Sequence, residues 1–200
     1  TDIKKHREKI MSQNEIRTFQ SKLAFHTAPS LLGIKCASLV AISKHECNIY
    51  ENVAAFNDRA ARTGLRISVL SECREKALIL VYNKEQLARR LSEPGPRKIL
   101  RSCEYTDDMT MEECLGKLSA RIRGSGEFPH EIGIFLGYPT EDVIGFIANN
   151  GGSFKLCGYW KVYGDEHRAE RTFENYNKCR NYLCRKLDSG EDFYRILKIS

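Results

Sequence analysis

The sequence predicts an α/β domain with a mixed sheet of four or five strands and helices on both faces, and an α+β arrangement is the alternative. Two strand-like runs at residues 66–71 and 76–82, joined by a charged turn, indicate a β-hairpin. Residues 128–165 then read as strand, helix and strand, which predicts a right-handed βαβ unit. With 200 residues, of which 42% are hydrophobic and 29% charged, the composition fits one domain over residues 1–200.

The N-terminal part is predicted to be mainly helical. Residues 1–13 are polar and indicate a frayed lead, and the apolar spacing that follows predicts a helix over about residues 14–28 that a proline ends. The apolar run at residues 39–42 fits either a buried helix or a first strand. A further helix is predicted over residues 46–63, where Gly64 supplies the left-handed residue that commonly ends a helix.

The second strand of the hairpin is expected to be central in the sheet. It reads KALILVY, which is apolar at consecutive positions rather than at alternate ones. Because successive side chains of a strand point to opposite faces, such a run is covered on both sides. Helices are therefore expected against both faces of the sheet.

Helices are also predicted over residues 84–92 and 109–122 from their apolar periodicity. The Glu-Pro-Gly-Pro sequence at residues 93–96 predicts a loop between them. The longest helix is expected over residues 165–187 and a short one follows it. These two C-terminal helices, within residues 165–200, are expected to pack on the sheet.

The predicted βαβ unit carries the residues that indicate a site. Its strands are expected at residues 131–137 and 155–163, with a short helix that Thr140 caps between them. Glycine inside a strand is disfavoured unless another group approaches the backbone closely. The sequence therefore predicts a pocket for a small planar or anionic ligand beside these strands. The candidate ligand-binding residues are His26, Gly133, Gly137, Tyr138, Tyr159 and Tyr163.

An enzyme that uses the same pocket is the first alternative. His130 or Glu131 would act as the acid–base group, and Cys157 or Lys161 as nucleophile or electrostatic anchor. The structural alternatives are a loop hydrogen bond for His130 and a small buried side chain for Cys157. No glycine-rich phosphate loop, nucleophile elbow, zinc-protease motif or dinucleotide fingerprint occurs in the sequence, so no cofactor is assigned. A haem- or iron-handling protein with His26, His130 or Cys157 as axial ligand is a variant of this alternative.

An interaction module is the second alternative. The net charge of +6 and the isoelectric point near 8.9 permit weak attraction to nucleic acid. A basic stripe on the predicted helix over residues 165–187 consists of Arg168, Arg171, Lys178 and Arg185. Such a stripe is usually the solvated face of an amphipathic helix, so nucleic acid is not the expected partner.

The cysteines and the hydropathy pattern bear on the location of the protein. The eight cysteines contain no Cys-x-x-Cys pair, which disfavours a zinc or iron–sulfur site and indicates reduced thiols. No run of about 18 or more apolar residues is present, and the N-terminal residues have no apolar core, so neither a membrane span nor a signal peptide is expected. The resulting expectation is a cytoplasmic protein without a metal site.

Several stretches of the sequence resemble a family of uncharacterised proteins. They read LAFHTAPSLLGIK, LSECREKALILVY, FPHEIGIFLGYP, EDVIGFI and CGYWKVYGD, and the similarity extends from about Leu23 to Cys184. The family is classed as a domain of unknown function and is found mainly in clostridia and related anaerobic bacteria. The resemblance implies a single-domain cytosolic protein without an established activity or cofactor. The residues that it places within the family's motifs are His26, His130, Tyr138, Tyr159, Trp160 and Lys161.

Overall fold

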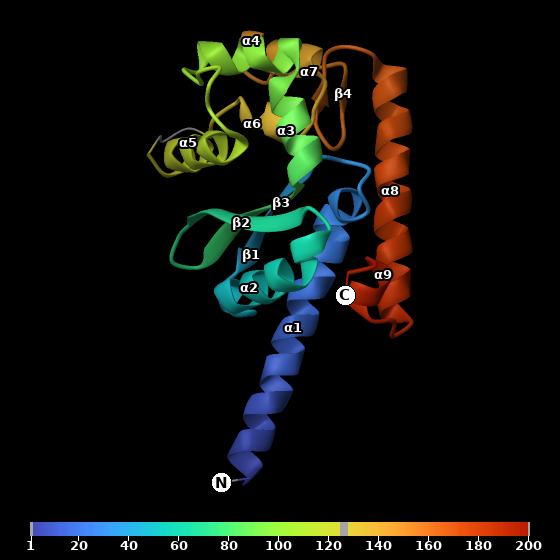
Figure 1. Cartoon of the computed structure of the whole chain (residues 1–200). Helices are drawn as coiled ribbons and strands as arrows, with labels where there is room; N and C mark the ends of the chain where they lie inside the picture. Colours follow the sequence, from blue (N-terminus) through green and yellow to red (C-terminus); the bar gives the residue numbers. More distant parts are fainter. Residues whose placement is uncertain (1, 125–127, 200) are drawn as a thin grey trace.

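A three-stranded antiparallel sheet lies in the middle of the molecule (Figure 1). The computed structural model describes the backbone of residues 2–124 and 128–199, and the side chains of these residues from residue 13 onward. The strands are β1 (Ala37–Ser43), β2 (Leu65–Glu72) and β3 (Lys76–Asn83), in the order β1–β3–β2. The predicted hairpin is confirmed, and the apolar run at residues 39–42 belongs to a strand.

The central strand β3 is buried on both faces, as its continuous apolar sequence predicts. Ile79 and Val81 point into the core on one face of the sheet, whereas Leu80 and Tyr82 point into the core on the other. In the orientation of Figure 1 we call these the lower core and the upper core. Helices cover both faces of the sheet.

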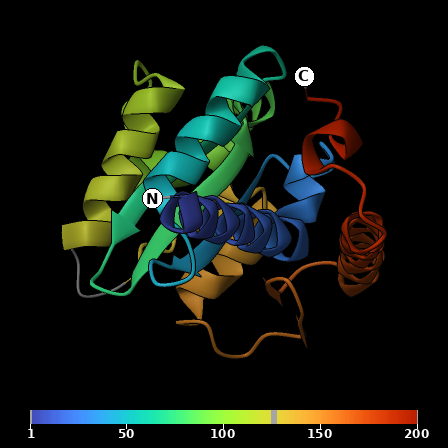
Figure 2. The same cartoon turned by 90° about the horizontal axis from the view of Figure 1, so that it is seen from below.

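The lower core lies between the sheet and helices from the two ends of the chain. These helices are α1 (Asp2–Leu31), α2 (Ile49–Arg59), α8 (Glu166–Asp188) and α9 (Phe193–Ile196). α1 and α8 pack along each other, and Figure 2 shows α9 beside them. The α2 helix continues into a 3₁₀ turn, η1 (Ala60–Arg62), and Gly64 follows with a φ of +75°, as expected for the end of this helix.

The upper core lies between the sheet and the helices of the middle of the chain. These helices are α3 (Lys84–Ser92), α4 (Pro94–Ser102), α5 (Met111–Gly124), α6 (Ile132–Phe135) and α7 (Thr140–Ala148). Its fully buried side chains include Tyr105 and Phe135, whose rings lie 5.9 Å apart. The predicted helices over residues 84–92 and 109–122 correspond to α3 and α5.

The loop predicted at residues 93–96 is wrong, because α4 begins there. Pro94 is the first residue of α4, and Pro96 lies in the first turn. The first N–H groups of a helix have no partner within the helix, so proline loses no hydrogen bond at these positions. The sequence that ends α3 therefore also starts the next helix.

The helix α1 is longer than the apolar pattern predicts. It begins at Asp2, within the residues 1–13 expected to fray, and it continues past Pro29 to Leu31. Lysine, arginine, glutamate and glutamine are good helix formers, but a prediction from the spacing of apolar residues takes no account of them.

None of the helices that the described residues form is long and apolar enough to cross a lipid bilayer.

The strand predicted at residues 131–137 is wrong, because this segment contains the single turn α6. Its apolar side chains are all buried. The turn ends at Gly137, which has a φ of +71°, and the N–H groups of Gly137 and Tyr138 donate to the carbonyls of Ile134 and Gly133, the pattern of a Schellman C-terminus. In a short apolar segment that is buried on all sides, the spacing of apolar residues does not distinguish a strand from a helix.

The strand predicted at residues 155–163 is a hairpin instead. β4 (Leu156–Cys157) pairs antiparallel with β5 (Lys161–Val162), and Gly158 begins the turn between them. The hairpin packs on α8 through Trp160 and Val162. Every strand pair in the described part of the chain is antiparallel, so the predicted parallel βαβ unit is wrong and the α+β alternative fits the fold. The predicted mixed sheet of four or five strands is wrong as well, because the described strands form one sheet of three strands and a separate hairpin of two.

Candidate functional site

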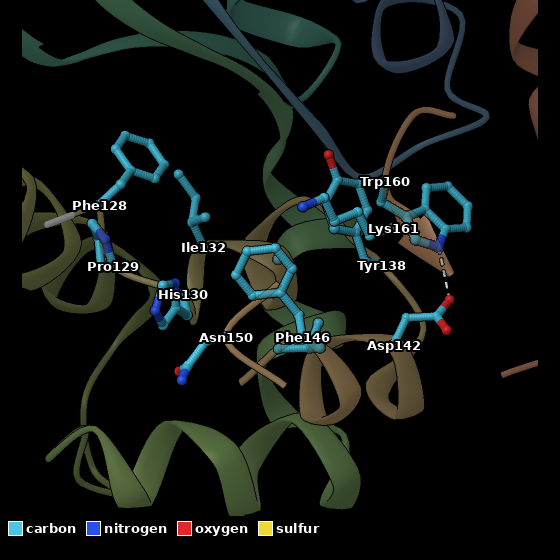
Figure 3. A pocket seen from close by; sticks show the side chains of 12 residues that line it. Phe128, Pro129, His130, Ile132, Tyr138, Asp142, Phe146, Asn150, Trp160 and Lys161 are labelled. Carbon is cyan, nitrogen blue, oxygen red and sulfur yellow. Dashed lines mark hydrogen bonds between the residues drawn. The ribbon is translucent and has the colours of Figure 1, made fainter. Parts of the chain in front are cut away.

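A cavity of about 790 Å³ lies between the segment before α6, the helix α7 and the β4–β5 hairpin (Figure 3). We call it the aromatic cavity. In Figure 3, Phe128 and His130 lie on one side, Trp160 and Lys161 on the other, and Phe146 between them. The lining residues are Phe128, Pro129, His130, Ile132, Gly133, Tyr138, Asp142, Val143, Phe146, Asn150, Trp160 and Lys161.

The walls of the aromatic cavity are flat and mainly apolar. The ring of Tyr138 stacks on Trp160, with the centroids 5.0 Å apart and an interplanar angle of 28°. His130 and Phe146 meet edge to face at 5.2 Å. Such ring pairs hold one another in a fixed orientation, so the cavity presents preformed planar surfaces.

Lys161 is the cation of the aromatic cavity. Its Nζ donates to the carbonyl of Gly151 over 2.6 Å and lies 5.7 Å from the ring centroid of Phe146. It also lies 4.9 Å from the ring centroid of Phe154. An ammonium has three N–H donors, so the bond to Gly151 leaves donors for a ligand.

Asp142 joins α7 to the hairpin and thereby builds one wall of the cavity. It is only 3% exposed. Its Oδ2 accepts a hydrogen bond from Trp160 Nε1 over 2.7 Å, and its Oδ1 accepts from the backbone N–H groups of Tyr163 over 2.7 Å and Gly164 over 2.8 Å. The sequence marks Asp142 only as an acidic residue in the first turn of a helix, which gives no sign of this role.

Glycines allow α6, α7 and the hairpin to approach one another closely. A Cβ on Gly133 would lie 2.8 Å from Cγ2 of Val143, and a Cβ on Gly137 would lie 2.8 Å from the thiol sulfur of Cys36. A Cβ carbon does not approach a non-bonded heavy atom this closely, so neither position accepts a side chain without movement. The sequence indicates that some group approaches the backbone at these two glycines. In the structure that group is a side chain of the protein itself, Val143 at Gly133 and Cys36 at Gly137.

Substituting Gly145 by alanine is expected to destabilise the protein by about 1–3 kcal/mol. Its Cβ would lie 2.4 Å from Cγ of Tyr163, whose backbone is fixed by Asp142. Gly116→Ala in α5 is the matched control, because nothing lies within 4 Å of its Cβ position and alanine favours a helix by about 0.5–1 kcal/mol. Urea denaturation of both variants measures the difference, and equal effects would contradict the close packing of α7 on the hairpin.

A second cavity, of about 260 Å³, shares Tyr138 with the first. We call it the Lys35 cavity. It contains two of the predicted ligand-binding residues that the aromatic cavity lacks, His26 and Tyr159. The hydroxyl of Tyr159 donates to Oδ1 of Asn177 over 3.0 Å. The lining residues are His26, Pro29, Lys35, Ser38, Leu39, Leu136, Tyr138 and Tyr159.

The remaining predicted site residues line neither of these two cavities. Glu131 is buried, forms an ion pair with Arg121 over 2.6 Å and accepts a hydrogen bond from the hydroxyl of Tyr105 over 3.3 Å. Cys157 is exposed on β4. The hydroxyl of Tyr163 donates to a backbone carbonyl over 2.8 Å, and Gly137 ends α6.

The enzyme alternative requires its acid–base group and its nucleophile or anchor to line one pocket, and the structure places only some of these residues together. Of its four residues, His130 and Lys161 line one cavity, whereas Glu131 and Cys157 do not line it. The proposed axial ligands His26 and His130 line different cavities. Among the described residues, no group of three or more histidine, cysteine, aspartate or glutamate side chains could hold a metal ion.

Comparison with known proteins places the chain in a family but assigns no activity. Residues 23–197 match the model of a family described as a protein of unknown function (DUF3793). No curated protein and no solved structure matches the sequence. Both cavities lie within the matched residues.

Proposed function

The chain belongs to this family of proteins of unknown function, and we propose that it binds a small planar ligand with an anionic group in the aromatic cavity. The observation that carries the proposal is the combination of fixed aromatic walls with the ammonium of Lys161 in one cavity. The cytoplasmic location and the clostridial origin that the resemblance implies are parts of the same proposal.

The size and walls of the cavity favour a planar molecule of the size of a cofactor or metabolite. Its volume of about 790 Å³ falls within the usual range for small-molecule sites, roughly 300–1,000 Å³. Four of the lining side chains are Phe, Tyr or Trp, namely Phe128, Tyr138, Phe146 and Trp160. Ring faces of this kind stack on a flat ligand, whereas a flexible polar chain would lose its hydration without gaining hydrogen bonds.

The charges of the cavity favour an anionic group on that ligand. Lys161 donates to one backbone carbonyl, and His130 at the opposite side is exposed. The carboxylate of Asp142 is engaged by three N–H groups, which offset its negative charge. An anion near Lys161 therefore gains a charge-assisted hydrogen bond in a largely apolar site.

A thermal-shift panel of flavin mononucleotide, haem, coenzyme A and adenine nucleotides tests the proposal. A ligand of the right class is expected to raise the melting temperature by about 5–10 °C at roughly 100 times its Kd, because it binds only the folded state. Lys161→Met is expected to weaken binding by about 10-fold or more through loss of the charged donor.

The control is Lys178→Met, which removes a lysine that is exposed on α8 and lies outside the cavity. This variant is expected to bind the ligand as the wild type does. No shift with any compound of the panel, or equal losses in Lys161→Met and Lys178→Met, would contradict the proposal.

A further inference from the structure

Lys35 is a buried lysine whose ammonium group lies beside two aromatic rings. It lies between α1 and β1, where its backbone N–H donates to the carbonyl of Pro29 over 3.1 Å, and it is only 8% exposed. Its Nζ lies 5.1 Å from the ring centroid of Tyr138 and 5.6 Å from that of Tyr176. Among the side chains that the structure describes, no aspartate or glutamate forms an ion pair with it. Cation–π contacts offset only part of the cost of burying an ammonium group.

The titratable groups around Lys35 supply no negative charge at neutral pH. Burial raises the pKa of the Cys36 thiol and that of the Tyr176 hydroxyl above their usual values, and it raises the pKa of Tyr138 to about 12. Burial also lowers the pKa of Lys35 itself to about 8, with a small opposing effect of Cys36. The ammonium is therefore mostly protonated at pH 7, and no described side chain supplies a counter-ion for its charge.

Two cationic side chains lie near one wall of the Lys35 cavity. That wall includes His26, whose pKa is lowered by burial and then by the charges of Lys22 and Arg180. Lys22 pairs with Glu46 over 3.0 Å, but Arg180 donates to the neutral side chain of Asn177 over 2.8 Å. The local field therefore favours the entry of an anion.

We propose that the Lys35 cavity binds a small organic carboxylate, with the carboxylate group on Nζ of Lys35 and a short apolar chain against Leu39 and Leu136. This site is distinct from the aromatic cavity and does not depend on the function proposed for it. The bound carboxylate provides the missing counter-ion, and the interaction is strong because the surroundings have a low dielectric constant.

The lining of the cavity distinguishes a carboxylate from a phosphate. Pro29, Leu39 and Leu136 make much of its surface apolar, and the hydroxyl of Ser38 already bonds to that of Ser30 over 2.8 Å. A phosphate would bring several acceptor oxygens to a site with one available cation, and buried acceptors without donors are costly. The volume of about 260 Å³ suits a carboxylate with a chain of a few carbon atoms.

Calorimetric titration of the full chain with butyrate tests the proposal. Wild type is expected to bind butyrate about 10- to 100-fold more tightly than Lys35→Met, because the variant loses a charge-assisted hydrogen bond. Affinity is also expected to fall as the pH is raised through about 8, where Lys35 loses its proton. Butyramide, which has the same shape without the charge, is expected to bind wild type no better than butyrate binds Lys35→Met.

Lys161→Met is the matched control, since it removes the lysine of the other cavity and is expected to keep the full affinity for butyrate. Lys35→Met is expected to keep the response to the planar compounds, so failure of one proposal is distinguishable from failure of the other. Three results would overturn the carboxylate site: no binding of butyrate at millimolar concentration, equal affinity in wild type and Lys35→Met, or tighter binding of inorganic phosphate than of butyrate.

Discussion

Replacing Asp142 by alanine is expected to lower the free energy of unfolding by about 3–5 kcal/mol, because three N–H donors lose their acceptor. The donors are the indole of Trp160 and the backbone N–H groups of Tyr163 and Gly164. Each unsatisfied buried donor costs about 1–3 kcal/mol, and water that enters the gap offsets part of the sum. Urea denaturation measures the loss.

Asp142→Asn provides the sharper version of this experiment. An asparagine keeps one oxygen for the two backbone N–H groups but directs its NH₂ group at Nε1 of Trp160, so two donors face each other. In a Trp160→Phe background that conflict is absent. We expect the asparagine to cost about 1–3 kcal/mol less there than in wild type. Equal costs in the two backgrounds would show that the indole–carboxylate bond does not hold the hairpin to α7.

Lys35→Met is expected to raise the free energy of unfolding by about 3 kcal/mol at pH 7. The pKa of Lys35 falls from 10.5 to about 8 on folding, and each pKa unit corresponds to about 1.4 kcal/mol. Methionine has a similar length and carries no charge, so the variant avoids the cost of burying the ammonium. This gain is unusual for a substitution in the interior, where most changes destabilise.

The pH dependence identifies the cause of this gain. Below about pH 8 both the folded and the unfolded wild type carry the proton on Lys35, so the advantage of Lys35→Met is constant. Between about 8 and 10.5 the unfolded state binds more protons, wild type gains stability as the pH rises, and the advantage declines. Lys98→Met, at an exposed position on α4, is the control and is expected to show no such decline. A constant difference between wild type and Lys35→Met up to pH 10.5 would contradict a buried charge.

The sequence predicts the central sheet better than the segments around the site. The continuous apolar run of β3 fixes a strand covered on both faces, and the charged turn before it fixes the hairpin. Residues 131–137 and 155–163 have the alternation and the β-formers of strands, yet they form a buried helical turn and a short hairpin. Their conformation depends on contacts with α7 and α8, and local propensity does not contain this information.

Some residues of the two cavities could be predicted from the sequence, whereas others could not. His130, Gly133, Tyr138 and Lys161 line the aromatic cavity, although residues 131–137 form a helical turn instead of a strand and Lys161 belongs to the short strand β5 of a hairpin. Asp142 and Lys35 are found only in the structure, because a charged residue in a sequence is normally exposed and nothing local marks these two as buried. Lys35 ends the stretch LAFHTAPSLLGIK, which resembles the family, but that resemblance implies no role for the lysine.

The composition of the lower core has a consequence for synthesis of the chain. Phe19 and Phe56 are buried there beside Phe193 and Ile199, which the ribosome adds more than a hundred residues later. Until Phe193 and Ile199 have left the exit tunnel, the nascent polypeptide exposes an apolar surface that chaperones recognise and that favours aggregation. Fast translation and chaperone supply are therefore expected to govern the yield of folded protein during expression.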